Sequence, residues 1–166
     1  MRAVIRVVLV AMLAMTLASC GSTKFRKYRG PAVTQILVDK SDRNMWLFHN
    51  DEVLKTYDVD LGRSPTGHKQ FEGDGKTPEG SYIIDRRNPN SRYHLSLGIS
   101  YPNQQDVAFA EAQGKLPGGE IFIHGHSRYQ GGNYGDWTVG CIAVSDREME
   151  TIYSMISNGT PITIRP

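Results

Sequence analysis

Short runs of apolar residues, separated by polar turns, fill the chain from residue 33 onward. Between Val53 and Leu61 the alternate positions Val53, Tyr57 and Val59 are apolar, with Lys55 among them, which suits a strand with one buried face. Similar runs bounded by turn residues predict further strands, at 34–39, 45–48, 82–84, 94–100, 121–124 and 160–165. The pattern therefore predicts a domain that is mostly β.

One stretch near the C-terminus has helical periodicity instead. Ser145 and Glu148 form a capping-box pair, in which a serine oxygen and a glutamate carboxylate satisfy free amides at a helix start. Apolar residues then recur at helical spacing as far as Ile156, and Asn158-Gly159 is a helix-ending signal. We expect one clear helix, at the C-terminal end of the domain.

Two long connections interrupt the strands. Residues 62–80 are rich in glycine and proline, and their turn pairs indicate a long surface hairpin. Residues 101–119 contain only a weak helical segment, at 107–112. Loops of this length are uncommon unless they are functional, for example as lids, so we expect a lid-like loop.

The first twenty residues differ from the rest of the chain. Arg2 and Arg6 flank the start of an apolar run, Val7 to Leu17, that is shorter than the about 20 residues of a membrane span. This anatomy predicts a secretory signal peptide over residues 1–19. Small residues before Cys20 resemble a bacterial lipobox, which implies that Cys20 carries a lipid. The alternative is an ordinary signal peptide followed by a chance cysteine.

A lipobox would make this an exported protein held to a membrane by its N-terminal lipid. Gly21, rather than an aspartate, follows the cysteine, and the usual sorting pattern then favours the outer membrane in a bacterium with two membranes. Residues 20–31 are small, polar and basic, and we interpret them as a tether. Residues 32–166 remain as the folded domain.

Composition excludes several classes of protein. A length of 166 residues fits one domain. The formal net charge is +2 with both signs mixed along the chain, so no basic stripe for nucleic acid is present. Two cysteines allow one disulfide at most, which excludes a disulfide-built scaffold. With Cys20 lipidated, Cys141 is the only free thiol. Nothing in the sequence indicates a particular protein partner.

The candidate chemistry lies between Ile121 and Ser145. A strand-like run ends at His124, a polar loop follows, and Gly140-Cys141 opens a second apolar run. A cysteine nucleophile needs a base or a cation nearby, because the thiolate is the reactive form. His124 at a strand end can supply the base. Gly140 allows close approach of the backbone and leaves local amides free for an oxyanion.

Other interpretations of these residues stay open at this point. A lone cysteine is often a small buried core residue, and a strand-end histidine can be purely structural. His124, His126 and Cys141 could also be three metal ligands, but Gly125 indicates that the strand stops before His126. We therefore expect no metal and no other cofactor, with His126 in the loop, where it contacts substrate or solvent.

Four stretches together resemble the L,D-transpeptidase catalytic domain family, also called the YkuD-like family. They are IFIHGH…DWTVGCIAVSD around the His/Cys pair, DGKTPEGSYII, YHLSLGISYPN and NGTPITIRP. The resemblance covers residues 32–166 and implies a β-sandwich or curved mixed sheet with a shallow cleft. It also implies a thiol acyltransferase that acts on the stem peptides of peptidoglycan.

Carried over residue by residue, the resemblance makes Cys141 the nucleophile and His124 the base. The carbonyl of Gly125 would orient the imidazole, and amides near Gly140 and Cys141 would form the oxyanion hole. Cys141 would attack the carbonyl of the third stem residue, a diamino acid, and terminal D-alanine would leave.

Substrate contacts are expected from His126, Trp137 and Thr138, with the loop 127–136 as the cover of the site. The chain departs from the family pattern at Val139, where many members have histidine. It departs again at Ala143, where many have arginine. Neither departure removes the His/Cys pair, so we expect an active enzyme.

The sequence leaves three functions open. Transfer of the thioester to an amine would make an L,D-transpeptidase. Transfer to water would make a peptidase or amidase that cuts peptidoglycan cross-links or protein–wall linkages, and the two altered motif positions favour this subgroup. An inactive wall-binding lipoprotein is the third alternative, disfavoured because Cys141 and His124 are both present.

Overall fold

The computed structural model describes residues 24–126 and 135–166. The predicted signal peptide, Cys20 and most of the predicted covering loop lie outside the described residues. Within the described ranges, no helix is both long enough and apolar enough to cross a membrane.

Eight strands of the described chain form one mixed sheet, in the order β3-β2-β1-β8-β4-β5-β6-β7. Most neighbours run antiparallel, whereas β1 with β8 and β6 with β7 are parallel. The strands are β1 (Gln35–Asp39), β2 (Asn44–His49), β3 (Glu52–Asp58), β4 (Gly80–Asn88), β5 (Ser96–Ile99), β6 (Phe122–His124), β7 (Ile142–Ala143) and β8 (Pro161–Arg165). The prediction of a mainly β domain with a curved mixed sheet is confirmed.

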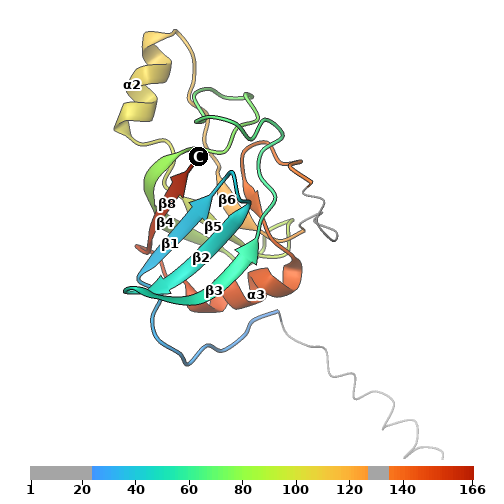
Figure 1. Ribbon diagram of the computed structural model, residues 1–166. Coiled ribbons are helices and arrows are strands. Elements are labelled where there is room, and N and C mark those ends of the chain that lie inside the picture. The colour runs from blue at the N-terminus through green and yellow to red at the C-terminus, as the bar shows by residue number, and fades with distance from the viewer. Residues whose placement is uncertain (1–23, 127–134) are drawn as a thin grey trace, which may run out of the picture.

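The sheet curls into a half-barrel whose two ends are joined by the segment that follows β3 (Figure 1). Asp60 and Ala143 exchange backbone hydrogen bonds of 2.9 and 2.8 Å, and Gly62 pairs with Thr138. Pairing across the ends satisfies backbone groups that an open sheet edge would leave exposed. It also brings the loop 62–80 beside β7.

The C-terminal helix, α3 (Asp146–Met155), begins where the capping box predicted. Its N-cap oxygen, Ser145 Oγ, accepts from the Glu148 amide at 3.3 Å. The helix ends before the predicted Asn158-Gly159 signal, because Ile156 turns to an extended conformation and buries its side chain in the core. Gly159 serves the turn into β8 instead, with φ +89°.

A second helix, α2 (Gln104–Ala112), lies at the other end of the molecule from α3 (Figure 1). The sequence indicated only a weak helical segment here, since the helix buries just Asp106 and Ala110 and has no apolar stripe. Its start is defined by capping instead, through Asn103, whose side chain accepts from two amides of the first turn. The C-terminal helix is thus one of two in the described chain.

Alternating side chains of the strands and one face of α3 form a single core. Ile36 and Val38 of β1 and Met45 and Leu47 of β2 are fully buried, as are Met149 and Ile152 of α3. Burial of each such side chain contributes about 1.5–3 kcal/mol relative to exposure. The alternation seen in the sequence is the inside–outside alternation of β1 and β2; in β3, by contrast, Val53 is 48% exposed and Leu54 packs against the core instead.

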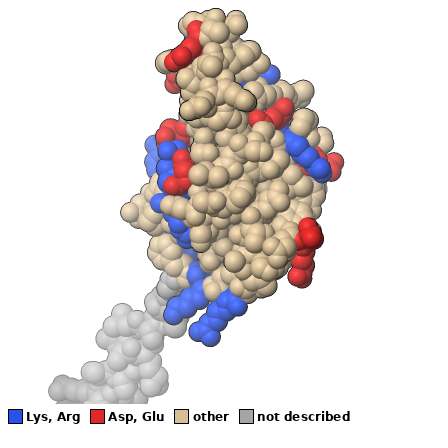
Figure 2. Space-filling model, turned by 90° about the vertical axis from the view of Figure 1, so that its left-hand side faces the viewer, with Lys and Arg blue, Asp and Glu red and all other residues tan. Residues whose placement is uncertain are grey.

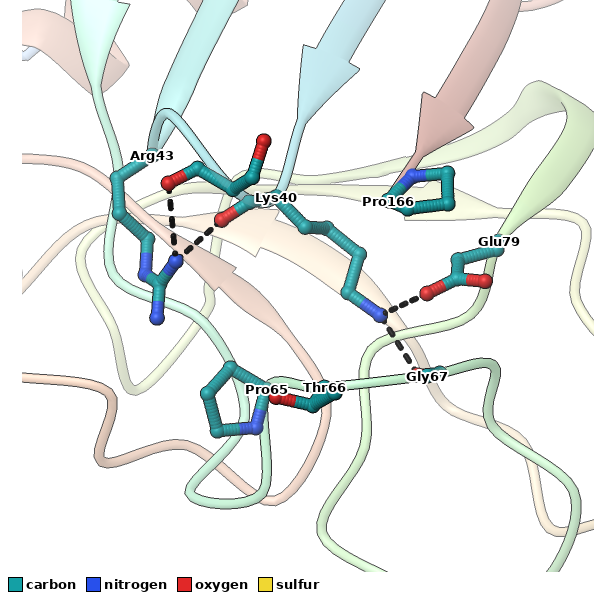
Figure 3. Close-up of a pocket in the computed structure, with 8 residues that line it drawn as sticks. Lys40, Arg43, Pro65, Thr66, Gly67, Glu79 and Pro166 are labelled. Carbon is teal, nitrogen blue, oxygen red and sulfur yellow. Dashed lines mark hydrogen bonds and ion pairs between the residues drawn. The ribbon is translucent and has the colours of Figure 1, made fainter.

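A buried lysine pins the loop 62–80 to the end of β1. Lys40, 3% exposed, donates to the carbonyls of Gly67 at 2.7 Å and Thr77 at 3.1 Å. Its third hydrogen bond goes to Glu79 Oε1 at 2.7 Å. Lys40, Gly67 and Glu79 line a cavity of about 180 Å³ together with Pro166 (Figure 3). Because all three ammonium hydrogens are used, the lysine is a structural anchor.

A second buried lysine organises the tip of the same loop. Lys69, also 3% exposed, donates to Asp74 Oδ1 at 2.9 Å. The Asp74 carboxylate accepts in addition from the amides of Gln70, Phe71 and Lys76. The loop that looked like a free hairpin is therefore a fixed platform, since a buried charge is retained only when it is paired and hydrogen-bonded.

Candidate active site

His124 ends β6, a strand that lies between β5 and β7. Its side chain is 2% exposed, and Nδ1 lies 2.6 Å from the carbonyl oxygen of Gly125. Because a carbonyl oxygen can only accept, the ring hydrogen sits on Nδ1 and the lone pair on Nε2 stays free. The imidazole is thus held in the tautomer that can take a proton at Nε2.

Aromatic rings surround this imidazole. The Tyr93 ring stacks on His124 with centroids 4.4 Å apart and planes 25° apart. The Trp137 ring meets the imidazole edge-on, with ring centroids 5.8 Å apart. Its centroid is also 5.8 Å from that of the Tyr93 ring. The Tyr93 carbonyl accepts from the Gly125 amide at 3.0 Å. Ring stacking and this backbone bond together fix the plane of the imidazole.

Cys141 directly precedes β7, which runs parallel to β6 with Ala143 opposite His124. The thiol is half-buried, and its Sγ donates to the carbonyl of Glu120 at 3.5 Å. The amide of Phe122 points at the sulfur from the neighbouring strand. Neighbouring strands therefore bring Cys141 and His124, seventeen positions apart in the sequence, to the wall of one cavity.

The turn before the thiol depends on glycine and on Thr138. Gly140 has φ +136°, and a Cβ there would lie 2.6 Å from the Lys76 carbonyl oxygen. The Thr138 hydroxyl accepts from the Gly140 amide at 3.1 Å and donates to the Cys141 carbonyl at 2.7 Å. Thr138 is 3% exposed and lines neither cavity at the thiol, so the structure gives it a role in shaping the turn.

The two amides expected at the oxyanion site differ in their availability. The Gly140 amide is already bonded to the Thr138 hydroxyl. The Cys141 amide makes no hydrogen bond to any group in the part of the chain that the structure describes. Of the two, the Cys141 amide is the one free to bind a developing oxyanion.

Burial shifts the pKa values of the two reactive groups in opposite directions. Loss of water lowers the pKa of His124; the Gly125 carbonyl opposes the shift, and His126 adds to it. Burial raises the pKa of the Cys141 thiol; the Phe122 amide opposes this shift, and Glu120 adds to it. Both shifts favour the uncharged form. At neutral pH the resting pair is therefore a thiol beside a neutral imidazole.

Two cavities meet at the thiol. The larger, about 370 Å³, is lined by His124 together with Arg92, Tyr93 and Ser96. The smaller, about 290 Å³, is lined on one side by Lys69 and the 72–73 turn and on the other by residues 118–121 and Val139. Cys141 and Glu120 border both cavities. The sulfur thus has open space on two sides, only one of which includes the imidazole.

His126 lies away from both cavities. Its backbone has φ +64°, its ring Nε2 is 3.4 Å from Asp146 Oδ2, and its amide donates to Asp146 Oδ1 at 2.8 Å. The ring also meets the edge of Tyr93, with centroids 5.9 Å apart. Within residues 24–126 and 135–166, no three His, Cys, Asp or Glu side chains are grouped so that they could hold a metal ion.

Residues 33–164 match the YkuD family, described as the L,D-transpeptidase catalytic domain. This chain belongs to the L,D-transpeptidase catalytic domain family. Two relatives, YafK of Escherichia coli strain K12 and YkuD of Bacillus licheniformis, carry names that provisionally assign them to the L,D-transpeptidases. Each is 26% identical to this chain, and the match covers 76% of this chain for YafK and 80% for YkuD. The chain spans about half of YafK, 48%, and 66% of YkuD.

Solved structures agree with this membership. The helical cell shape determining protein Pgp2 of Campylobacter jejuni superposes with a TM-score of 0.61 at 26% identity, over 90% of this chain and 52% of that chain. Bd1075 of Bdellovibrio bacteriovorus superposes with a TM-score of 0.59 at 25% identity, over 85% of this chain and 50% of that chain. The L,D-transpeptidase of Mycobacterium smegmatis, at 16% identity and a TM-score of 0.54, shares the fold; the match covers 81% of this chain and 59% of that one.

The two departures from the L,D-transpeptidase motif lie in different surroundings. Val139 is 61% exposed and lines the smaller cavity beside the thiol. Ala143 is fully buried and is held by its backbone to Asp60, so an arginine at this position would bury a charge. The change at Val139 therefore alters the cavity lining directly, whereas the change at Ala143 does not.

Sequence reasoning missed three residues at this site. Tyr93 opens one of the family-like stretches, which is the signal that could have identified it. Arg92, its neighbour, lines the larger cavity. Glu120 gave no signal, because its contact with the thiol depends on the register of β6 and on its own φ of +55°.

Proposed function

We propose that this protein is a peptidoglycan-modifying cysteine acyltransferase that forms a thioester on Cys141 and passes it to an amine. The observation that carries the proposal is the placement of Cys141 and His124 on one cavity wall, with the imidazole tautomer fixed by Gly125. Membership of the L,D-transpeptidase family supports stem peptides as the substrate class.

In the first step Cys141 Sγ attacks the carbonyl carbon of the third stem residue while His124 Nε2 takes the thiol proton. A C–S bond forms, and the C–N bond to terminal D-alanine breaks. His124 returns the proton to the leaving amine, so the enzyme is left with a thioester and a neutral imidazole. Base catalysis from a neutral pair accounts for a nucleophile whose own pKa is raised.

The negative charge on the tetrahedral intermediate needs hydrogen-bond donors. The Cys141 amide is available for it, and the Gly140 turn presents that amide beside the sulfur. In comparable sites, loss of one such donor lowers kcat by about 10²–10³-fold. We assign the oxyanion to the Cys141 amide, with Gly140 as the residue that shapes the turn.

In the second step the nitrogen of an acceptor amine attacks the thioester carbonyl and loses a proton to His124 Nε2. A C–N bond forms, the C–S bond breaks, and His124 returns the proton to the Cys141 sulfur. The leaving and the incoming nitrogen both exchange a proton with the same Nε2. Both must therefore approach through the larger cavity, which His124 lines, and the acyl part of the substrate lies in the smaller one. Arg92 in the larger cavity provides a positive charge for the carboxylate of the departing D-alanine.

Space on both sides of the sulfur is compatible with an amine acceptor. Once D-alanine has left, transfer to an amine needs room for a second peptide beside the acyl group, and the larger cavity provides it. The thiol of this chain borders two cavities of similar size. Transfer to water is the second candidate, supported by the altered cavity lining at Val139.

The same proposal includes export and lipid anchoring. The apolar run 7–17 and the residues around Cys20 support a lipid-anchored protein that faces the cell wall, with the outer membrane as the proposed location. Mass spectrometry of the mature N-terminus tests this part. A diacylglycerol-modified Cys20 is expected, and an unmodified N-terminus elsewhere would contradict it.

Product analysis tests the reaction. Purified full chain is incubated with peptidoglycan that carries tetrapeptide stems, and the muropeptides are identified by mass spectrometry. We expect new cross-links between two third-position diamino acids, together with free D-alanine. Shortened stems without cross-links would identify a hydrolase. An unchanged muropeptide profile would identify an inactive wall-binding protein.

A further inference from the structure

The first residues that the structure describes, 24–30, pack against the domain as a strap. We call this segment the N-terminal strap. It runs past α3 at one end of the molecule (Figure 1), where Lys and Arg side chains gather (Figure 2). Phe25 lies against Tyr153 of α3 with ring centroids 6.4 Å apart, and Tyr28 packs on the core.

Lys24 clamps the two ends of the short loop that precedes β5. Its ammonium donates to the carbonyl of Pro89 at 2.6 Å and to the carbonyl of His94 at 3.1 Å. Arg92 and Tyr93 lie between these two carbonyls and line the larger cavity. A residue sixty-five positions earlier in the chain thus closes the loop on which this wall of the active site is built.

Arg26 holds the same loop through an intermediate carboxylate. Its guanidinium donates to Glu150 Oε2 at 2.9 and 2.7 Å, and Glu150 Oε1 accepts from His94 Nε2 at 3.1 Å. His94 itself has φ +70°, a region that residues with a Cβ adopt at a cost of about 1–3 kcal/mol. The strap therefore holds both the backbone and the ring of a strained residue.

The clamped loop in turn holds the imidazole. Tyr93, directly before His94, stacks on the His124 ring at 4.4 Å. The Tyr93 carbonyl accepts from the Gly125 amide, and the Gly125 carbonyl fixes His124 Nδ1 at 2.6 Å. A continuous set of contacts, three hydrogen bonds and one ring stack, thus runs from the Lys24 ammonium to the base.

We propose that Lys24 is a positioning residue of the active site, which acts through Tyr93 on the orientation of His124. The proposal rests on the function proposed above for His124. It assigns to the N-terminal strap a part in catalysis in addition to any part in connecting the domain to an anchor. A lysine that only stabilised the fold would have no specific relation to Tyr93.

A double-mutant cycle tests this relation. The full chain is compared with Lys24→Ala, Tyr93→Leu and the double variant at a temperature where all are folded. Lys24→Arg keeps charge and donors, and Lys27→Ala removes an exposed cation from the same strap. Each protein is assayed for kcat/KM, and its His124 ring resonances are recorded by NMR.

We expect Lys24→Ala to lower kcat/KM by about 10-fold, because small misplacements of a catalytic group are costly. Its His124 resonances shift toward those of Tyr93→Leu. The double variant loses no more than Tyr93→Leu alone, and Lys24→Arg and Lys27→Ala stay within about twofold of the unmodified chain.

Losses that multiply in the double variant would overturn the proposal, as would unchanged His124 resonances in Lys24→Ala. The NMR readout does not depend on turnover, so it judges the positioning role even if no acyl transfer is found. Failure of the acyltransferase proposal is seen separately, as muropeptide products that do not require Cys141.

Discussion

The Cys141 thiol is half-buried and the His124 imidazole is buried, and burial moves their pKa values apart in the direction of the neutral forms. A pair of this kind does not rest as a thiolate and an imidazolium. It reacts when substrate lies against the thiol and the proton moves as the C–S bond forms. Kinetic measurements can distinguish this neutral pair from a thiolate–imidazolium pair.

The acid limb of turnover should lie at low pH. Only neutral His124 can accept a proton, and its pKa is depressed, so the ring becomes protonated only below about pH 6.5, the usual value for histidine. Activity should therefore persist as the pH falls through that value and decline at lower pH. A profile of kcat/KM against pH checks this. An acid limb centred above pH 6.5 would contradict a buried neutral base.

Loss of His124 should separate turnover from thiol ionisation. We expect His124→Ala to lower kcat by at least about 100-fold, the usual range for a general base. Alkylation of Cys141 by iodoacetamide should keep the same alkaline pH dependence in both proteins, since the thiol is neutral at rest. An alkylation limb near pH 5–6 that disappears with the histidine, about where a paired thiolate ionises, would instead show a preformed ion pair.

Arg92 should act on binding more than on chemistry. Removing a charge-assisted hydrogen bond to a carboxylate costs about 1.5–3 kcal/mol, so Arg92→Ala should raise KM for tetrapeptide stems roughly 10- to 100-fold. Lys55→Ala, an exposed cation on β3, is the matched control and should leave KM unchanged. An unchanged KM in Arg92→Ala would remove this residue from the carboxylate site.

At the scale of elements, two strand ends and one loop form the site. β6 brings the base and the turn before β7 brings the nucleophile. The loop 62–80 supports that turn, because its Arg63 amide donates to the Thr138 carbonyl and its Lys76 carbonyl lies close to Gly140. Lys40 and Lys69 hold the loop in place through hydrogen bonds to Thr77 and Asp74. The turn is therefore held by the loop on one side and by the Thr138 hydroxyl on the other, and this keeps the Cys141 amide in place.

Gly140→Ala tests this support. A Cβ would lie 2.6 Å from the Lys76 carbonyl oxygen at φ +136°. We expect a loss of about 1–3 kcal/mol in the free energy of unfolding and a larger loss of turnover than stability explains. Gly159→Ala, at φ +89° with nothing within 4 Å, is the control and should keep full activity. Denaturant unfolding and kcat/KM measure both; equal activity of the two variants would contradict the role of the turn.

Across the whole molecule, local patterns predicted local features. The strand alternation and the Ser145 cap of α3 could be found in the sequence, since each depends on neighbours within a few positions. The His124/Cys141 pair, seventeen positions apart, was indicated by the short motif around each residue and by the family resemblance. The joining of Asp60 to Ala143 and the Lys24 clamp could not be found there, because each joins segments more than sixty residues apart. The periodicity of the sequence carries no information about such contacts. They are nevertheless what forms the active site on the curved sheet.

Acyl-enzyme formation at Cys141 is the step on which the account depends. The full chain is mixed with a tetrapeptide-stem fragment, quenched in acid and weighed by intact-protein mass spectrometry. We predict an adduct equal to the fragment minus D-alanine, located on the peptide that contains Cys141 and absent from Cys141→Ala. Release of D-alanine by Cys141→Ala at the rate of the unmodified chain would contradict the account.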